Sequence, residues 1–311
     1  MSEEDILNLK FRLLDLFVEL DNRELDSIEA WIGSLSYKEA LETKRRLKKT
    51  EKIFDKIGDA IKKLVPFEAE MKSEEILPPT IGDQADCNKI NTMHVDEFLY
   101  DEDKVSELVE QKKLTRHYCL DCHSRNVEEL IFISHSMSKQ ALQYIFKVLL
   151  PSDLSEKQIL DVGSRLGAVL YAAFYFSNAS TIVGVEMNED CCAVQNKIIT
   201  QFNMDSNRIK VIHSDVMEVS DLVKMSDIVI INVLDFFVDI EKHKKMWHFF
   251  KSNLKKGSYL ISNRSMNYTL NILGLLEELN DWLSICKPHQ PENEMLFNIE
   301  DYSEILIYKI N

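Results

Sequence analysis

The chain has 311 residues, 45% of them hydrophobic and 29% charged, which is enough for one α/β domain of ordinary size and a smaller unit. Its formal net charge of −15 excludes nucleic-acid binding over the whole surface through phosphate contacts, although a local basic patch can still bind. No apolar run reaches the roughly 18 residues of a membrane-spanning helix, so we expect no membrane partner.

The six cysteines are unevenly placed, and three of the first five residues are acidic, so the chain does not begin with an apolar signal. Cysteines in such a pattern do not predict a disulfide framework and favour a reducing compartment. Without a secretory signal, we expect an intracellular protein that is either cytoplasmic or nuclear.

Residues 1–70 are expected to form a helical N-terminal region. Leu9, Leu13 and Leu16 recur at helical spacing, and Pro66 marks the end of the last predicted helix. A basic cluster runs from Lys44 to Lys49. The favoured interpretation is a solvated helix face balanced by nearby glutamates; the alternatives are a docking patch for RNA or an acidic partner, or a nuclear-targeting signal.

Residues 71–128 are predicted to form a linker, because Pro78-Pro79 and several polar residues interrupt any helical or strand pattern. This segment contains a Cys-x-x-Cys pair, Cys119 and Cys122. Two cysteines make half of a structural zinc site, and no second pair completes it. We therefore expect no metal, with zinc at this pair as the less favoured alternative.

Residues 129–311 are predicted to form an α/β domain. A β-branched strand runs from Ile159 to Val162, a glycine turn starts at Gly163, a helix follows, and a second strand ends at Glu186. The glycine turn lets the backbone approach a ligand, and an acid about 20 residues later can bind two ribose hydroxyls. The turn lacks the third glycine that receives a pyrophosphate, so the pattern favours a ligand with a ribose but no phosphate.

Three more strands follow in the same order of strand and helix. These strands are predicted at residues 208–213, 227–232 and 258–263. Helices are predicted before the first strand, at residues 190–202, between the last two, at residues 239–254, and after the last, at residues 268–280. The first of these strands leads to Asp215, a third acid at a strand end. The last two strands, residues 282–286 and 305–310, are predicted to form a closing hairpin.

The segment from Asp161 to Glu186 resembles the cofactor-binding motif of the class I S-adenosylmethionine-dependent methyltransferases. The resemblance implies a Rossmann-like sheet of seven strands, with an antiparallel last strand, behind the N-terminal helical region. It also implies that Glu186 binds the cofactor ribose and Asp215 the adenine amino group. Arg165 stands where the family has its middle glycine; it either tolerates an altered turn, facing the methionine carboxylate, or weakens the site. The implied S-adenosylmethionine-binding residues are Asp161, Gly163, Ser164, Arg165, Gly167, Glu186, Met187, Ser214, Asp215, Val216 and Asn232.

Over about residues 159–265, the chain is similar to the non-SET histone lysine methyltransferases that silence telomeres. Asn232 matches the first of two asparagines in that family, whereas Val233 and Leu234 replace the second asparagine and the aromatic residue. The resemblance implies methyl transfer to a protein side chain, with Asn232 or Asp235 near the proton acceptor. The alternatives are an RNA or small-molecule methyltransferase, and a catalytically silent protein that binds S-adenosylmethionine.

Overall fold

The computed structural model describes residues 2–121, 125–232 and 234–311. The chain divides into two compact units, Met1–Lys49 and Thr50–Asn311. The predicted boundaries at residues 70 and 128 both fall within the second unit. Within the described ranges, no helix combines the length and the apolar content that a membrane crossing requires.

The first unit consists of α1 (Glu3–Val18), α2 (Asn22–Gly33) and the beginning of α3 (Tyr37–Ile61). Ser2 and Asp21 start the first two helices as capping boxes, in which the side chain accepts a backbone N–H bond that the helix cannot satisfy itself. The sequence prediction of a helical N-terminal region agrees with these three helices.

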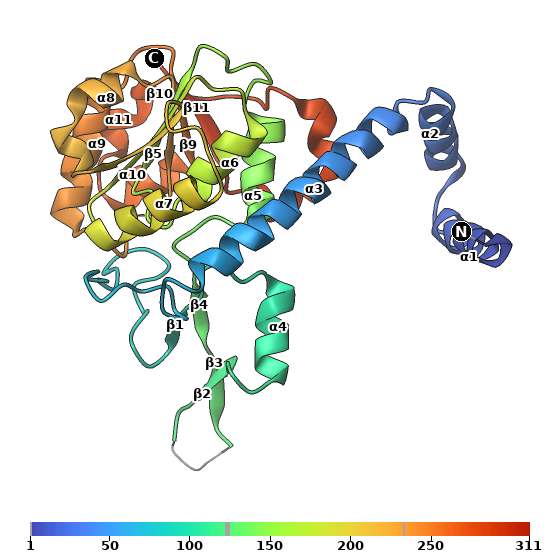
Figure 1. The fold of residues 1–311 in the computed structure, drawn as a ribbon, viewed down its shortest axis with the longest axis horizontal. Helices are drawn as coiled ribbons and strands as arrows, with labels where there is room; N and C mark the ends of the chain where they lie inside the picture. The colour runs from blue at the N-terminus through green and yellow to red at the C-terminus, as the bar shows by residue number, and fades with distance from the viewer. Residues whose placement is uncertain (1, 122–124, 233) are drawn as a thin grey trace. The chain divides into compact units, whose positions relative to one another are not determined.

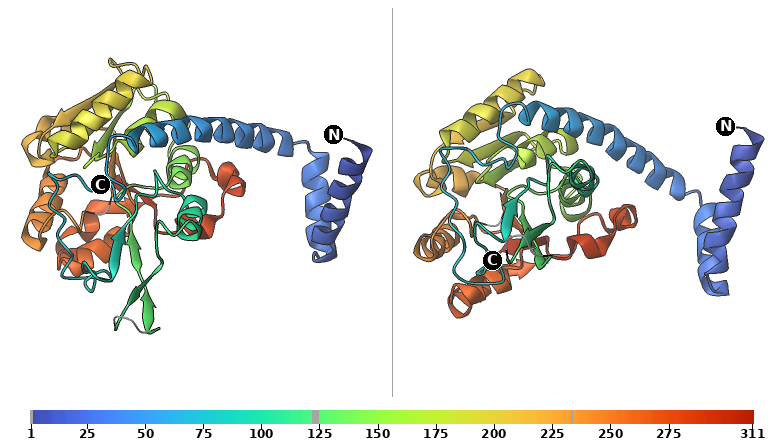
Figure 2. Two further views of the ribbon diagram at one scale, coloured as in Figure 1. Left: turned by 60° about the horizontal axis from the view of Figure 1, so that its bottom comes forward. Right: turned by 90° about the horizontal axis from the view of Figure 1, so that it is seen from below.

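In the second unit, the segment that precedes the large sheet carries short elements. β1 (Thr92–His94) pairs in parallel with β4 (Ile131–Ile133), and β2 (His117–Cys119) pairs antiparallel with β3 (Val127–Glu129). One helix, α4 (Glu102–Glu110), lies between β1 and β2 in the chain. In Figures 1 and 2 the β2–β3 hairpin points away from the large sheet. The sequence predicts a linker here, and the segment instead holds two small sheets.

The predicted zinc alternative involves Cys119 and Cys122, and only the first of them is described. Cys119 is exposed at the end of β2, whereas Cys122 lies outside the described residues. Among the residues that the structure describes, no group of three or more His, Cys, Asp or Glu side chains is arranged to hold a metal ion. Zinc at this pair therefore stays an untested alternative.

The core of the second unit is a seven-stranded sheet in the order β10-β11-β9-β8-β5-β6-β7. Strand β11 is antiparallel to both of its neighbours, and the strands from β9 to β7 are parallel to one another. This arrangement confirms the predicted α/β sheet with an antiparallel last strand. The bounds are β5 Gln158–Val162, β6 Thr181–Glu186, β7 Ile209–His213, β8 Ile228–Ile231, β9 Tyr259–Ser262, β10 Leu283–Ile285 and β11 Leu306–Ile310.

Helices cover both faces of the sheet. The central strands β5 and β8 are therefore buried at nearly every position and are mostly apolar. Figure 1 shows α5 (Lys139–Tyr144), α6 (Ala168–Phe176) and α7 (Glu189–Gln201) on the side opposite to α9 (Ile240–Asn253). Leu160, Val183 and Val229 pack with Trp247 and Phe250 of α9 in one buried cluster. A short helix, α8 (Ser220–Met225), lies between β7 and β8 in the chain.

One predicted helix differs from the one observed, and one further helix changes type along its length. The helix predicted at residues 268–280 is divided into α10 (Met266–Ile272) and α11 (Leu276–Leu279), because Gly274 adopts a φ of +70° between them. The helix after Ser138 begins as α5 and continues as one turn of π-helix, η1 (Ile145–Leu149). Helical periodicity alone does not distinguish these variants from a regular α-helix.

The strand order places a crevice at one edge of the sheet. Strand β5 pairs with β6 on one side and with β8 on the other, so the chain reverses its direction of progress across the sheet at β5. In open α/β sheets, ligands bind outside the carboxyl ends of the strands at such a switch point. The residues that follow β5, β6, β7 and β8 therefore form the candidate site.

Candidate functional site

A cavity of about 360 Å³ lies at the carboxyl ends of these parallel strands. Its volume falls in the range of small-molecule sites. Eight of the predicted cofactor-binding residues line it: Gly163, Arg165, Glu186, Met187, Ser214, Asp215, Val216 and Asn232. Residues 73–75, which precede the domain predicted from the sequence, line it as well.

The glycine turn lies beside the end of β6. Gly163 adopts a φ of +70°, a conformation that favours glycine, and its N–H donates to the carbonyl oxygen of Val185 at 2.9 Å. The nearest atom to a Cβ added at Gly163 belongs to Leu234, at 3.8 Å. The backbone at this turn is therefore open toward the cavity instead of being packed against other backbone.

Glu186 is held firmly at the end of β6. One carboxylate oxygen accepts the N–H of Arg165 at 2.8 Å, and the other accepts the N–H of Asn188 at 2.7 Å. Burial raises the pKa of Glu186, while these two backbone donors act in the opposite direction. Each oxygen keeps a second acceptor position, so the carboxylate can still receive two hydroxyl donors from a ligand.

Asp215 begins a short 3₁₀-helix, η2 (Val216–Glu218), by accepting the N–H of Met217 at 2.9 Å. Its other oxygen lies 2.9 Å from Nζ of Lys242, on the first turn of α9. Both side chains line the cavity. The acid at the third strand end therefore caps a helix and forms an ion pair while it faces the cavity.

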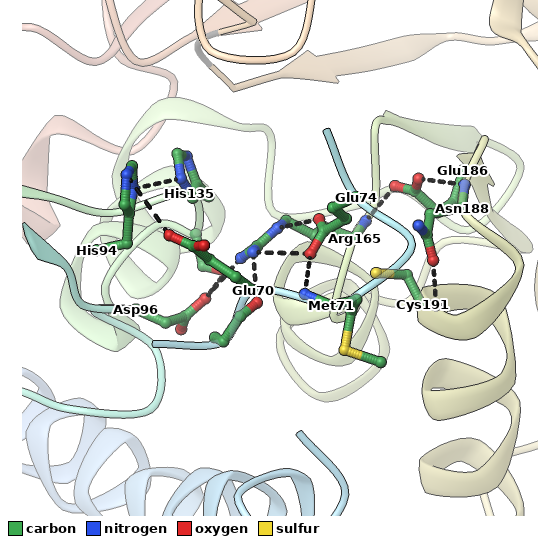
Figure 3. Close-up of polar contacts among 12 residues, drawn as sticks. Glu70, Met71, Glu74, His94, Asp96, His135, Arg165, Glu186, Asn188 and Cys191 are labelled. Atoms are coloured by element: carbon green, nitrogen blue, oxygen red, sulfur yellow. Dashed lines mark hydrogen bonds and ion pairs between the residues drawn. The ribbon is translucent and has the colours of Figure 1, made fainter. Parts of the chain in front are cut away.

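Arg165 adopts a φ of +43°, so the chain follows the family's turn without the middle glycine. Its side chain does not project into the cavity as a free charge. Nε lies 2.9 Å from Glu74 Oε1 and Nη1 lies 3.5 Å from Asp96 Oδ2 (Figure 3). Nη2 donates to the carbonyl oxygen of Ala69. The expectation that Arg165 faces a methionine carboxylate is thus corrected: two buried carboxylates from residues 74 and 96 already neutralise the guanidinium.

Three of the predicted cofactor-binding residues are not among those that line the cavity. Ser164 Oγ donates to Gln195 Oε1 at 2.9 Å, and Gly167 caps the start of α6 with a φ of +87°. Asp161 is buried, and its Oδ2 has no hydrogen-bond partner among the described residues. Burial, followed by the charge of Glu186, raises the pKa of Asp161 well above its ordinary value. These three residues belong to the turn and its flanking elements but do not line the cavity.

Asn232 and His135 both line the cavity and contact each other. The Asn232 amide nitrogen donates to the backbone carbonyl of His135 at 2.9 Å, whereas Asn232 Oδ1 is buried without a partner among the described residues. A buried amide oxygen without a partner is costly, and this oxygen is available to accept a hydrogen bond from a ligand in the cavity. From the sequence, His135 is a possible lining residue of the cofactor site but not a catalytic candidate, because a histidine beside a helix cap is more often a local hydrogen-bonding residue.

Asp235, the other candidate for the proton acceptor, lies elsewhere. It forms an ion pair with Arg264, and its Oδ1 lies 3.6 Å from His243 Nδ1. It lines a second cavity of about 600 Å³, together with residues 77–81 and the start of α9. Because Asp235 is paired with Arg264 and does not line the first cavity, we withdraw it as the acceptor of a proton at that cavity.

The strand order identifies the fold. Numbered along the chain from β5, the strands stand in the order 3-2-1-4-5-7-6, with the seventh antiparallel. This is the class I methyltransferase fold. A dinucleotide-binding sheet would continue with parallel strands instead.

The solved structures that are similar to this chain are distant in sequence. An RNA methyltransferase from Salinibacter ruber has 16% identity and a TM-score of 0.32 over 40% of this chain and 71% of its own. A SAM-dependent methyltransferase from Streptococcus mutans has 15% identity and a TM-score of 0.39 over 55% of this chain, which spans about half (48%) of that protein. Geranyl diphosphate C-methyltransferase from Streptomyces coelicolor A3(2) has 12% identity and a TM-score of 0.40, over 56% of this chain and 79% of its own.

No protein-family model matches the sequence, and no curated protein sequence matches it either. The identities and TM-scores of these structural matches are too low to support the fold assignment, which therefore rests on the strand order alone. The resemblance to the telomeric histone lysine methyltransferases stays a prediction from the residues.

Proposed function

We propose that this protein is an S-adenosylmethionine-dependent methyltransferase. The observation that carries the proposal is the position of the Glu186 carboxylate, which two backbone N–H groups fix at a cavity beside the open turn at Gly163. In the class I fold, this is the place where an acid receives the ribose hydroxyls. Asp215 and Val216, at the next strand end, then border the adenine.

The charges around the cavity suit a cationic cofactor. Glu74 is paired with Arg165 and Asp215 with Lys242, so Glu75 and Glu186 are the acids of the described cavity lining that have no basic partner within it. S-adenosylmethionine carries a sulfonium and an ammonium against one carboxylate, so an excess of acidic groups favours its binding. The free Oδ1 of Asn232 supplies an acceptor for one further donor.

The bound cofactor would supply an activated methyl group, so the protein needs to align the acceptor with it and to exclude water. Phe237, Val238 and Met246 give the cavity an apolar wall for this purpose. Asn232 is positioned by its bond to the His135 carbonyl, and we infer that it orients the acceptor.

We propose that the acceptor is a protein side chain. The second cavity supports this choice because it shares Val238 with the first and is bordered by Asp235, Asp239 and Glu241. Acidic residues beside the first cavity favour a basic side chain over a nucleic-acid backbone, which also agrees with the net charge of −15.

Radiolabel transfer tests this function. The protein is incubated with methyl-tritiated S-adenosylmethionine and fractionated cell lysate, and the labelled fraction is treated with protease or nuclease. We expect label that protease releases and nuclease does not, and none with the Glu186→Ala variant. Label in RNA or in small molecules would replace the protein acceptor by the alternatives. A protein that binds S-adenosylhomocysteine yet transfers no label is a silent cofactor-binding protein.

A further inference from the structure

Two histidines lie side by side at the wall of the cofactor cavity. His94 ends β1 and His135 follows β4, the strand paired with β1. His135 Nε2 lies 2.9 Å from His94 Nδ1, and the two rings are close to parallel, with an interplanar angle of 22° (Figure 3). One imidazole therefore donates a hydrogen bond to the other.

The chain of polar groups continues away from the cavity. His94 Nε2 lies 3.6 Å from Glu70 Oε1, and the side chain of Glu70 is 41% exposed. His135 lines the cavity, whereas Glu70 does not. A proton that enters at His135 thus meets first a hydrogen bond to His94 and then, at ion-pair distance, a carboxylate that is partly exposed to water.

The bond to His94 uses Nε2 of His135 and leaves Nδ1 as the nitrogen for a ligand. The hydrogen bond of the His135 ring among the described residues is the one from Nε2, and none involves Nδ1. Phe236 and Phe237 hold the His135 ring by edge contacts, with centroids 5.5 and 4.7 Å away. The ring orientation is fixed by packing, as a proton acceptor requires.

A stored positive charge on His135 is disfavoured. Burial, and then the charges of Arg165 and His94, lower the pKa of His135 to about 2. Burial also lowers the pKa of His94, while Glu70 acts in the opposite direction. The other charged groups of this region, Glu74 and Asp96, are engaged with Arg165. A base at this position works only if it passes its proton on at once.

We propose that His135 takes the proton of the methyl acceptor and that His94 and Glu70 relay it to solvent. This inference rests on the proposed methyltransferase function. The acceptor atom bonds to the methyl carbon, and the sulfur–carbon bond breaks with its electron pair on sulfur. The acceptor's proton goes to His135 Nδ1, the Nε2 proton of His135 to His94 Nδ1, and the Nε2 proton of His94 to the Glu70 carboxylate. The net charge of each imidazole is unchanged.

The relay predicts the protonation of both rings. In nitrogen-15 NMR spectra of the histidine-labelled protein, assigned with His94→Asn and His135→Asn, both rings are expected to be neutral at pH 7 and protonated at Nε2. A charged His135, or a His135 protonated at Nδ1, would overturn the proposal without any measurement of activity.

Label transfer tests the relay in function. His135→Asn is expected to lower kcat on the order of 10²-fold, the usual contribution of a general base, with unchanged affinity for S-adenosylhomocysteine. Glu70→Gln is expected to lower kcat without raising KM, and Glu70→Asp is expected to restore part of the rate. Glu68→Gln, an exposed residue two positions away, is the matched control and is expected to match the wild type.

The failures are distinguishable. If the wild type transfers no label, the proposed function and the base role fall together. If the wild type transfers label and His135→Asn transfers it at the same rate, the base role falls alone. If Glu70→Gln and Glu68→Gln behave alike, the relay beyond His135 falls.

Discussion

Arg165 Nε lies 2.9 Å from Oε1 of Glu74, a residue 91 positions earlier in the chain. Both side chains are only 6% exposed. The residue that replaces the middle glycine of the turn thus anchors the segment before the sheet to the cofactor site. Because Glu74 lines the cavity, this ion pair also fixes one wall of it.

Restoring the family's glycine is therefore expected to destabilise the protein. Arg165→Gly relieves a positive φ, worth about 1–2 kcal/mol, but leaves two carboxylates buried without their partner, which costs about 3–5 kcal/mol. We expect a net loss of about 2 kcal/mol in the free energy of unfolding, measured by urea denaturation. The double variant Arg165→Gly with Glu74→Gln should recover part of the loss, and a single variant as stable as the wild type would contradict this description of the ion pair.

Gly167 is required for its lack of a side chain as well as for its φ of +87°. A Cβ at this position would lie 2.6 Å from the ring of Tyr171, whereas one at Gly257, whose φ is +85°, would meet nothing within 4 Å. Gly257→Ala should therefore cost about 1–2 kcal/mol for the backbone alone. Gly167→Ala should cost clearly more in the same thermal or urea denaturation, and equal losses would show that Tyr171 moves aside freely.

Asp161 predicts a pH-dependent stability. Its pKa in the folded protein is raised well above 3.8, so above that pH the folded state binds more protons than the unfolded state. The stability contribution of Asp161 is therefore greatest at low pH and falls as pH rises toward the folded pKa. Relative to the wild type, Asp161→Asn should gain up to about 1.4 kcal/mol per pH unit across this window.

The control for this measurement is Asp221→Asn, since the Asp221 side chain is 92% exposed. Its difference from the wild type should stay nearly constant from pH 4.5 to 7.5 in urea denaturation. An Asp161→Asn variant that is less stable than the wild type throughout would mean that the carboxylate has a partner that stabilises its charge.

Most strands of the large sheet could be predicted from the sequence because they are marked by short runs of mostly apolar residues. The β-branched runs that end at Val162, Glu186 and Ile231 are strands in the structure, and the closing hairpin from Leu283 to Ile310 occurs as predicted. The division of a helix at Gly274 was missed, since a single glycine within a helical pattern is often tolerated.

The walls of the site could not be predicted, because they come from distant parts of the chain. Glu74 has no strand or helix pattern around it, and its role arises from contact with Arg165. The relation of His135 to His94 depends on the parallel pairing of β1 with β4, two strands of three residues that are too short to recognise by alternation. The ion pair of Asp235 with Arg264 likewise joins residues 29 positions apart.

Calorimetric titration with S-adenosylhomocysteine tests the central claim most directly. The wild type should bind it, and Glu186→Ala should lose at least about 100-fold in affinity, because hydrogen bonds to a charged group contribute about 1.5–3 kcal/mol each. Gly163→Arg should abolish binding by filling the cavity, while Glu189→Ala, an exposed acid three residues beyond Glu186, should bind as the wild type does. Equal affinity of the wild type, Glu186→Ala and Gly163→Arg, or no binding by the wild type, would contradict a cofactor site at this cavity.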